Sequence, residues 1–231
     1  MAYTKRPDGR KFDELRKLHA EVGVVPNADG SALFATGDTI ALASVYGPKT
    51  LNPKHMQNPT KGVLRVHYNM LPFSVSERAR PGLSRRSQEI SKVTEWALSS
   101  VVMLDELPGT VIDIHIVIPQ ANAGTRCEGI NAAAMALAHA GVPMTEMVSA
   151  VSVGKIDDKI CVDLIKEEED YEDGEGATDI PITYLANSKK ITLLQLDGRI
   201  QVERFKEVLD AGREACEKIY ALQKKVLKEV R

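Results

Sequence analysis

The sequence predicts an α+β fold in which groups of strands alternate with helices to form two sheet-and-helix layers. Several short runs alternate apolar and polar residues, as half-buried strands do, and three longer segments repeat apolar residues at helical spacing. The strands outnumber the helices, and the helices fall between groups of strands. No linker rich in proline, serine or glycine divides the 231 residues, so we expect a single domain over residues 1–231.

The first half of the chain should begin with a hairpin meander. Turn sequences rich in Asn, Asp and Gly separate its strands at residues 27–30 and 36–39, and an irregular loop with three prolines follows over residues 47–62. Ser84 is the expected N-cap of a helix that continues as far as the stop at residues 107–109. The strands expected in this half span residues 20–25, 31–35, 40–46, 63–71 and 111–118.

The second half repeats this pattern after an alanine-rich helix over residues 131–140. Its last element is a long amphipathic helix whose apolar stripe runs from Val202 to Val226. The strands expected in this half span residues 148–153, 159–164, 180–185 and 191–196.

Composition excludes several classes of protein. The apolar runs are far shorter than the ~20 residues that span a bilayer. Residues 1–10 are polar and basic with no apolar signal core behind them, so we expect a cytoplasmic protein without membrane association. Cys127, Cys161 and Cys216 are odd in number and far apart, which argues against a disulfide framework or a cysteine-based zinc site.

The charges are distributed unevenly, although the net charge of −2 rules out a uniformly basic nucleic-acid surface. One stretch is basic and contains Arg78, Arg80, Arg85, Arg86 and Lys92. Another stretch is acidic and contains Glu167, Glu168, Glu169, Asp170, Glu172, Asp173, Glu175 and Asp179. Either stretch alone could be a solvated face.

A loop made of Gly124, Thr125 and Arg126 joins the strand expected at residues 111–118 to the alanine-rich helix. Such a loop directs unpaired backbone N–H groups at one point, and the helix dipole adds partial positive charge there. Arg126 adds a fork of donors and Thr125 a hydroxyl. We therefore predict a phosphate site here. The alternative is that Gly124 only makes the turn and Arg126 is solvated.

The chain resembles the RNase PH family over nearly its whole length, because seven motifs of that family occur in it in the same order. Within that family it is most similar to the catalytic ring subunits of archaeal exosomes. The motifs are Arg-Pro-Asp-Gly-Arg at 6–10, Tyr-Asn-Met-Leu-Pro-Phe at 68–73, Ser-Arg-Arg-Ser at 84–87 before Glu89 and Ile90, Ala-Asn-Ala-Gly-Thr-Arg at 121–126, Val-Gly-Lys at 153–155, Asp-Leu at 163–164 and Leu-Asp-Gly at 196–198.

The resemblance implies an RNase PH-type domain that acts as a phosphorolytic 3′→5′ exoribonuclease. Inorganic phosphate attacks the terminal phosphodiester and releases a nucleoside diphosphate, and the reverse reaction adds tails. Gly124, Thr125 and Arg126 are implied to bind the attacking phosphate. Arg85 and Arg86 are implied to grip phosphates at the RNA 3′ end, where a bidentate arginine suits a phosphate better than lysine does.

The resemblance also implies a pair of acidic residues. Asp179 fits the second position, whereas the usual family spacing selects Asp173 for the first, and counting from residues 163–164 selects Asp170. Both remain candidates, because this loop is longer than in close relatives. A carboxyl group could protonate the leaving oxygen, or Asp173 and Asp179 could hold Mg²⁺. Mutual repulsion would raise one pKa of the pair, whereas bound Mg²⁺ would keep both groups ionised.

An entry path for single-stranded RNA is implied at the segment before Met70, which contains Arg65 and Tyr68. Tyr68 could stack on a base, a contact worth ~1–3 kcal/mol, or it could pack into the sheet.

The implied partners are an inactive RNase-PH-like homologue, which alternates with the catalytic subunit in a hexameric ring (a trimer of heterodimers), and RNA-binding cap subunits. Ala123, where bacterial RNase PH has glycine, favours the exosome. Two alternatives remain open: a free-standing homo-hexameric RNase PH that trims tRNA 3′ ends, and a non-catalytic RNA-binding ring subunit.

Overall fold

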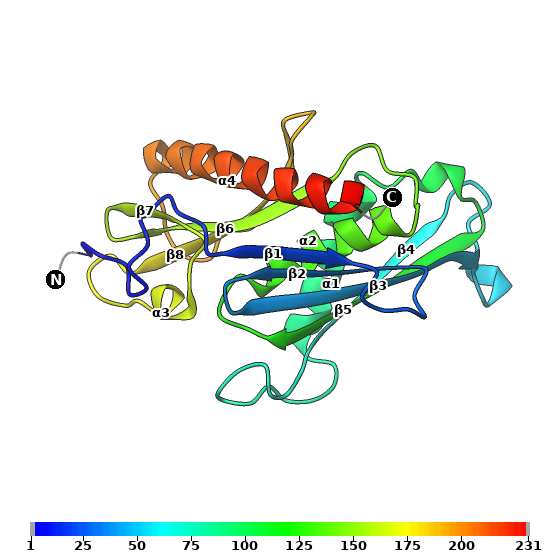
Figure 1. Cartoon of the computed structure of the whole chain (residues 1–231), viewed down its shortest axis with the longest axis horizontal. Helices are drawn as coiled ribbons and strands as arrows, with labels where there is room; N and C mark the ends of the chain where they lie inside the picture. Colours follow the sequence, from blue (N-terminus) through cyan, green and yellow to red (C-terminus); the bar gives the residue numbers. More distant parts are fainter. Residues whose placement is uncertain (1–2, 230–231) are drawn as a thin grey trace.

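A computed structural model describes residues 3–229 as two β-sheets and four α-helices (Figure 1). The first sheet has the order β1-β2-β3-β5-β4, in which only β4 and β5 pair in parallel. Its strands are β1 (Leu18–Val22), β2 (Gly30–Thr36), β3 (Thr39–Thr50), β4 (Val63–Met70) and β5 (Thr110–Gln120).

The second sheet is antiparallel throughout and has the order β7-β6-β8-β9. Its strands are β6 (Val148–Ile156), β7 (Lys159–Val162), β8 (Ala177–Leu185) and β9 (Lys190–Leu194). The helices are α1 (Arg85–Ser99), α2 (Thr125–His139), α3 (Lys166–Glu169) and α4 (Val202–Glu229). Short 3-10 turns occupy Lys54–Met56 and Leu104–Glu106.

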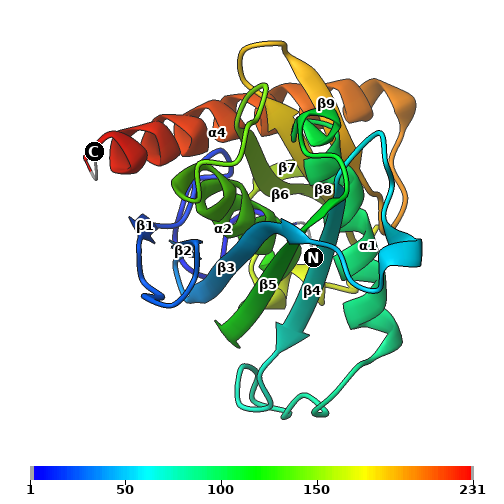
Figure 2. The same cartoon turned by 90° about the vertical axis from the view of Figure 1, so that its right-hand side faces the viewer.

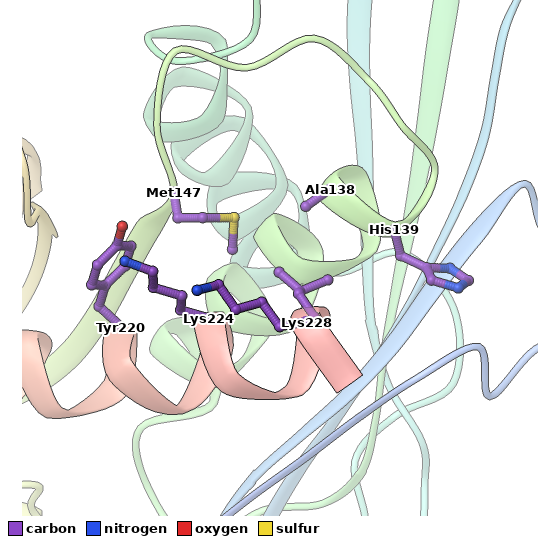
Figure 3. A pocket seen from close by; sticks show the side chains of 7 residues that line it. Ala138, His139, Met147, Tyr220, Lys224 and Lys228 are labelled. Atoms are coloured by element: carbon purple, nitrogen blue, oxygen red, sulfur yellow. The ribbon is translucent and has the colours of Figure 1, made fainter. Parts of the chain in front are cut away.

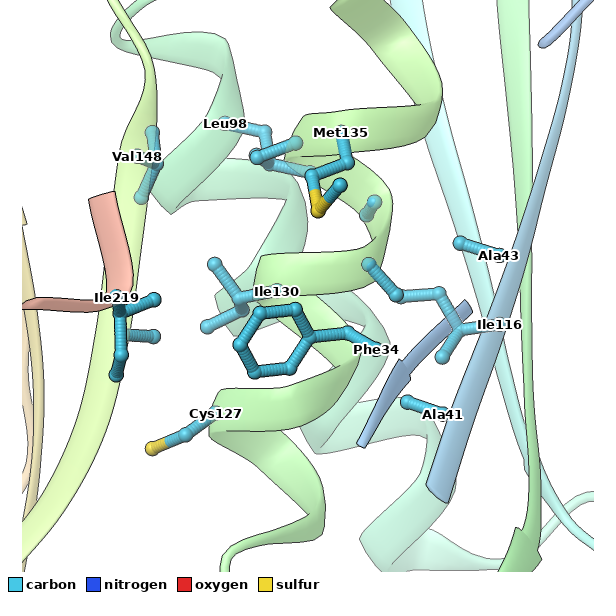
Figure 4. Close-up of a cluster of buried hydrophobic side chains, with 14 of the residues drawn as sticks. Phe34, Ala41, Ala43, Leu98, Ile116, Cys127, Ile130, Met135, Val148 and Ile219 are labelled. Atoms are coloured by element: carbon cyan, nitrogen blue, oxygen red, sulfur yellow. The ribbon is translucent and has the colours of Figure 1, made fainter. Parts of the chain in front are cut away.

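Helix α2 lies between the two sheets, where it contacts β2 and β3 on one side and β6 on the other (Figure 2). Helix α4 covers β6 and reaches β1, while α1 packs on β4. One hydrophobic cluster runs through all these layers and joins Phe34, Ile116, Ile130, Met135 and Ile219 (Figure 4). The two sheets therefore share a core, and α2 is its centre.

The alanines of α2 explain how a helix fits into this position. Ala132, Ala133, Ala134 and Ala136 are fully buried, because methyl side chains let the backbone of a helix approach a sheet on either side. The contact with β2 is closest at Gly30, where a Cβ would lie 2.3 Å from the Ala136 carbonyl oxygen. No larger residue fits at Gly30 unless the helix moves.

The α+β class and every strand and helix expected from the sequence are confirmed, with differences at their ends. Strand β3 continues to Thr50, because Lys49 and Thr50 pair with Val111 and Thr110 after a register shift, where we expected an irregular loop from residue 47. Helix α1 begins after Ser84, whose side chain forms a capping box with Ser87, as expected. The helix stops earlier than expected.

Three further differences concern the connections. The chain leaves α1 after Ser99 and forms a bridge between Val102 and Met144, which ends the helical pattern. Helix α2 begins at Thr125, nearly two turns before the alanine run. Helix α3 has four residues and was not expected, because a single turn has no detectable periodicity.

The structure bears on two expectations from composition, which concern the cysteines and membrane-spanning helices. Cys127, Cys161 and Cys216 are buried free thiols, as expected. Within residues 3–229, none of the helices combines the length and the hydropathy that a membrane crossing requires.

The contact at Gly30 gives a first prediction. Gly30→Ala should lower the free energy of unfolding by about 1–3 kcal/mol, because the new methyl group overpacks β2 against α2. Urea denaturation would measure this loss. Glu21→Ala on the neighbouring strand is the control, because Glu21 is exposed and its substitution should change stability by less than about 0.5 kcal/mol. Equal losses in both variants would contradict the packing argument.

Candidate active site at the phosphate loop

The phosphate loop, residues 121–126, connects the end of β5 to the start of α2. Ala123 and Gly124 both have left-handed backbone conformations, with φ of 59° and 67°. Gly124 is the N-cap, and its carbonyl accepts the N–H groups of Cys127 and Glu128 at 2.9 and 3.2 Å. The N–H groups of Thr125 and Arg126 precede the first hydrogen bond of the helix, so an anion can bind there. The predicted strand–loop–helix arrangement is confirmed.

Two side chains from other segments fix the backbone of the loop. The Thr39 hydroxyl contacts the Asn122 and Ala123 carbonyl oxygens at 2.9 and 2.8 Å, and it accepts the Asn122 N–H at 3.0 Å. Arg16 donates to the Asn122 carbonyl at 2.6 Å. The loop is therefore held before any ligand binds, which reduces the entropy cost of binding a phosphate.

Tyr68 supports this loop from below. Its ring is 3% exposed, its hydroxyl donates to Thr125 Oγ1 at 2.9 Å, and burial raises the pKa of Tyr68 to about 12. A base cannot stack on a ring that is buried in this way. The RNA-stacking interpretation of Tyr68 is therefore wrong, and the packed alternative is the one that the structure shows.

Arg126 connects three elements around the loop. Its guanidinium donates to Gln195 Oε1, and Gln195 Nε2 donates to Glu89 Oε1 at 3.3 Å. Glu89 lies on α1, and Gln195 directly follows β9. The predicted phosphate ligand Arg126 is therefore oriented by a glutamine that sequence analysis missed, because Gln195 stands in no phosphate motif.

Asp179 lies on β8, close enough to the phosphate loop for the charge of Arg126 to act on its pKa. It accepts a hydrogen bond from the Ser152 hydroxyl, and its backbone exchanges two 2.8 Å hydrogen bonds with Asp197. Burial raises the pKa of Asp179, although Ser152 and the positive charges of Arg126 and Arg86 oppose the shift. These charges place Asp179 within electrostatic reach of both arginines.

The acidic stretch contributes a second carboxyl from α3, and that carboxyl belongs to Glu169. Burial raises the pKa of Glu169 to about 7, the negative charge of Asp179 adds to this shift, and Lys166 and Arg86 oppose it. Asp170, the next residue, is 61% exposed and pairs with Lys166 at 2.6 Å. Glu169 belongs to the acidic stretch, but the sequence predicted Asp170 or Asp173 for the first acidic position.

The candidates for the first acidic position therefore differ in their surroundings. Asp170 caps α3 beside Glu169, whereas Asp173 is exposed in the bend that leads to Gly174. Helix α3 is consequently the part of the acidic stretch that approaches Asp179.

Arg85 and Arg86, at the start of α1, differ in the groups that their charges reach. Both are exposed in its first turn. The charge of Arg86 lowers the pKa values of Asp179, Glu169 and Tyr68, which puts Arg86 beside the carboxylates and the phosphate loop. Arg86 is thus the member of the pair that the structure brings into the site.

Comparisons with known proteins show which family the chain belongs to. The 3′ exoribonuclease family, domain 1, matches residues 14–143, and domain 2 of the same family matches residues 146–215. The chain belongs to the RNase PH family. The predicted resemblance is confirmed.

Its similar relatives in the family carry one name. The exosome complex component Rrp41 of Thermococcus gammatolerans is 49% identical over 225 residues, which are 97% of this chain and 89% of the relative. The proteins of the same name from Nitrosopumilus maritimus and Methanopyrus kandleri are 46% and 45% identical, with 97% of this chain covered in each case and 91% and 92% of the relatives.

Solved structures share the fold at lower identity. Rice Rrp46 superposes with a TM-score of 0.84 at 24% identity and covers 96% of this chain and 100% of its own. A structure of the Archaeoglobus fulgidus exosome with RNA bound to the active site has a TM-score of 0.80, also at 24% identity, and covers 96% and 92%. These values show the RNase PH fold.

Arg65 does not belong to the RNase PH site that surrounds the phosphate loop. It lies on the outer face of β4 and pairs with Asp113 on β5 at 3.1 Å, beside Lys49 at 2.8 Å from the same carboxylate. Tyr68, three residues further along the strand, points inward. The two side chains are therefore on opposite faces of the sheet and about 10 Å apart along it.

The N-terminal motif of the RNase PH family holds α3 in place. Arg6 and Glu168 form an ion pair of 2.7 Å with both side chains fully buried, and the Tyr3 hydroxyl donates to Glu168 at 2.7 Å. Arg6 also donates to the carbonyls of Val162 and Asp163 at 2.9 and 2.8 Å. Because Glu168 directly precedes Glu169, this buried pair positions the carboxyl that approaches Asp179.

The arrangement of the carboxylates decides whether the predicted Mg²⁺ could bind. Among residues 3–229, no three His, Cys, Asp or Glu side chains are grouped so that they could hold a metal. Mg²⁺ typically binds one or two carboxylates together with substrate phosphates and water. Asp179 and a carboxylate of the acidic stretch fit that donor set.

A cavity lies at the other end of α2 (Figure 3). It has a volume of about 460 Å³ and is lined by Ala138, His139, Met147, Tyr220, Lys224, Leu227 and Lys228. The 15 residues of α2 separate it from the phosphate loop by about 20 Å. We place the candidate active site at the loop, where the charged side chains converge.

The buried pair below α3 gives a second prediction. Arg6→Ala should lower the free energy of unfolding by about 3–5 kcal/mol, because it leaves the Glu168 carboxylate buried without its partner. Urea denaturation would measure the loss. Lys166→Ala, which breaks the exposed pair with Asp170, is the control and should change stability by less than about 1 kcal/mol. A loss no larger than that of the control would contradict the buried pair.

Proposed function

We propose that this chain is the catalytic subunit of an exosome and degrades single-stranded RNA from its 3′ end by phosphorolysis. The observation that carries the proposal is the convergence of Arg126 and Arg86 with the carboxyl of Asp179 at an anion-binding helix N-terminus. The names of the relatives at 45–49% identity support the assembly. The family's description supports the 3′ direction.

The phosphate loop would bind the attacking phosphate. Its N–H groups and the Arg126 guanidinium neutralise an anion that must approach the anionic phosphodiester. Arg86, whose charge also reaches Asp179, would hold the scissile phosphate of the RNA. Arg85, exposed on the same turn, would bind the next phosphate along the chain. The arginines thereby align the attacking oxygen with the bond that breaks.

The carboxyl groups would serve the leaving 3′-oxygen. Burial raises the pKa of Asp179, so a protonated carboxyl can exist closer to neutral pH and can donate its proton to that oxygen. Mg²⁺, when bound by Asp179 and a carboxylate of the acidic stretch, would instead stabilise the developing negative charge. In both cases, Asp179 is the central acidic residue.

We further propose the partners that the resemblance implies, namely an inactive RNase-PH-like homologue in a hexameric ring and RNA-binding cap subunits. We also propose a cytoplasmic location, which the composition favours. Arg65, on the outer face of the first sheet, would contact RNA on its way to the site. The free-standing tRNA-trimming enzyme has less support, because the relatives are named as exosome components. The non-catalytic alternative has little support, since Arg126, Arg86 and Asp179 are all present.

Digestion of 5′-labelled oligo(A) tests the reaction. The chain should be assayed alone and with its ring partner, with and without inorganic phosphate, and the released nucleotide identified. We expect phosphate-dependent release of ADP, with a loss of about 100-fold or more in Arg126→Ala and Asp179→Ala. Arg204→Ala is the matched control, because Arg204 lies on α4 and pairs with Glu207 at 2.8 Å.

Each other outcome of that digestion has a defined meaning. AMP released without phosphate would contradict phosphorolysis. RNA that binds without any product, in the presence of the partner, would favour the non-catalytic alternative. Equal activity of a homo-oligomer without a partner would favour the free-standing enzyme.

A carboxylate series tests the acidic pair. Glu169→Gln and Asp170→Asn should each slow ADP release by about tenfold or more, because Glu169 is the carboxyl that approaches Asp179 and Asp170 adjoins it as the C-cap of α3. Asp173→Asn should stay within about threefold of the wild type, because Asp173 is exposed outside α3. The rate at saturating RNA and phosphate would measure these effects. A larger loss in Asp173→Asn would assign the first acidic position by family spacing instead.

A further inference from the structure

Glu128 is a buried carboxyl directly behind the phosphate loop, and the proposed reaction does not use it. It lies on α2, one turn after Gly124, and is 4% exposed. Its N–H donates to the Gly124 carbonyl at 3.2 Å. A Cβ on Gly124 would lie 2.9 Å from Glu128 Oε2, so the carboxyl packs against the α-carbon of the N-cap residue.

The side chains around Glu128 do not provide a cation that is free to pair with its carboxylate. Arg16, a cation whose charge acts on Glu128, donates two guanidinium hydrogen bonds to Asp163, at 2.6 and 2.9 Å, and Arg10 approaches the same aspartate at 3.2 Å. Within residues 3–229, Oε2 of Glu128 has no hydrogen-bond partner. The positive charge nearby is therefore already matched by another carboxylate.

This environment favours the neutral acid. Burial raises the pKa of Glu128 to about 8, with Arg16 opposing the shift, Asp163 adding to it and Thr36 opposing it. Tyr68 and Cys127 also face the carboxyl, and its negative charge raises their pKa values in turn. The neutral acid of Glu128 is therefore favoured near pH 7, and the carboxyl loses its proton as the pH rises through about 8.

We propose that Glu128 is a positioning residue for the attacking phosphate: its neutral carboxyl supports Gly124 from behind, and loss of its proton to solvent weakens phosphate binding at residues 124–126. A carboxylate here would oppose the positive end of the α2 dipole and repel the incoming anion. It would also compete with Asp163 for Arg16. Arg16 holds the Asn122 carbonyl of the loop at 2.6 Å, so that competition would disturb the loop.

The inference rests on the proposed function, because it requires phosphate to bind at this loop. If phosphate prefers the protonated form, its affinity falls as the pH rises through the pKa of Glu128. A single coupled proton limits the fall to about tenfold per pH unit. Inorganic phosphate remains a dianion from pH 8 to pH 10, so its own ionisation does not contribute.

The experiment uses the full chain and inorganic phosphate. The dissociation constant would be measured from the phosphate-induced rise in Tm between pH 7 and pH 10, and the phosphate KM from the assembled ring. In the wild type we expect both constants to rise by about tenfold between pH 8 and pH 10. Glu128→Gln, which keeps the shape and stays neutral, should hold the pH 8 value up to pH 10.

Two further measurements make the test independent of that variant's folding. Calorimetry of the wild type in buffers of different ionisation enthalpy should show that phosphate binding near pH 8.5 takes up a fraction of a proton. Glu167→Gln, at an exposed carboxylate on α3, is the matched control and should keep the wild-type pH dependence.

The outcomes separate this inference from the proposed function. Flat wild-type affinity, no proton uptake, or the same fall in Glu128→Gln as in the wild type would overturn the role of Glu128. The phosphate loop would still stand in those cases if Arg126→Ala abolishes phosphate binding. Absence of phosphate binding at every pH would overturn both.

Discussion

The burial of α2 between the two sheets is the constraint on which the rest of the structure depends. An exposed helix can shift or fray, but a helix that is buried on all sides and packed between two sheets has one position. Its N-terminus is consequently fixed relative to β8 in the second sheet and to α1 on the first. A phosphate loop at that N-terminus can therefore face Asp179 and Arg86, which come from opposite sides of the core.

The charges around this helix end balance one another. Arg86 and Arg126 each lower the pKa of Asp179, while burial raises it, and Arg86 acts in the same direction on Glu169. Without RNA and phosphate, the carboxyls partly neutralise the arginines. If anionic substrates bind here as proposed, the arginines would acquire stronger partners, and the carboxyls would lose part of the attraction that favours their ionised form. Substrate binding would thus move the carboxyls towards the protonated state that the proposed proton donor needs.

Sequence reasoning found the parts of the site that are local and missed the parts that depend on tertiary structure. Gly124, Thr125 and Arg126 are adjacent in the chain, so a strand–loop–helix pattern was enough to predict their geometry. Glu169 could not be selected from eight neighbouring acids, because its distinction is burial near Asp179, which only the folded chain creates. Gln195 was missed for the same reason.

The fold itself was predicted to a similar extent. The strands and long helices carry periodic patterns, and these were correct in number and order. The extension of β3 to Thr50 depends on pairing with β5, and the single turn of α3 depends on the buried contact of Glu168 with Arg6. Tyr68 illustrates the ambiguity of an aromatic residue on a strand: the alternation of β4 permits either face to be buried, and only its hydrogen bond to Thr125 decides.

Two arginines near the N-terminus tie these observations together. Arg6 pairs with Glu168 below the acidic stretch, and Arg16 pairs with Asp163 while holding the Asn122 carbonyl of the phosphate loop. Buried ion pairs contribute little net stability compared with apolar pairs of the same size, but an arginine fork fixes direction. Residues 6–16 thus position both sides of the site, the side that would bind phosphate and the side that would serve the leaving oxygen. These residues are not themselves among the charged side chains that converge there. Because Arg16 cannot pair fully with both Asp163 and Glu128, this arrangement also requires Glu128 to stay neutral.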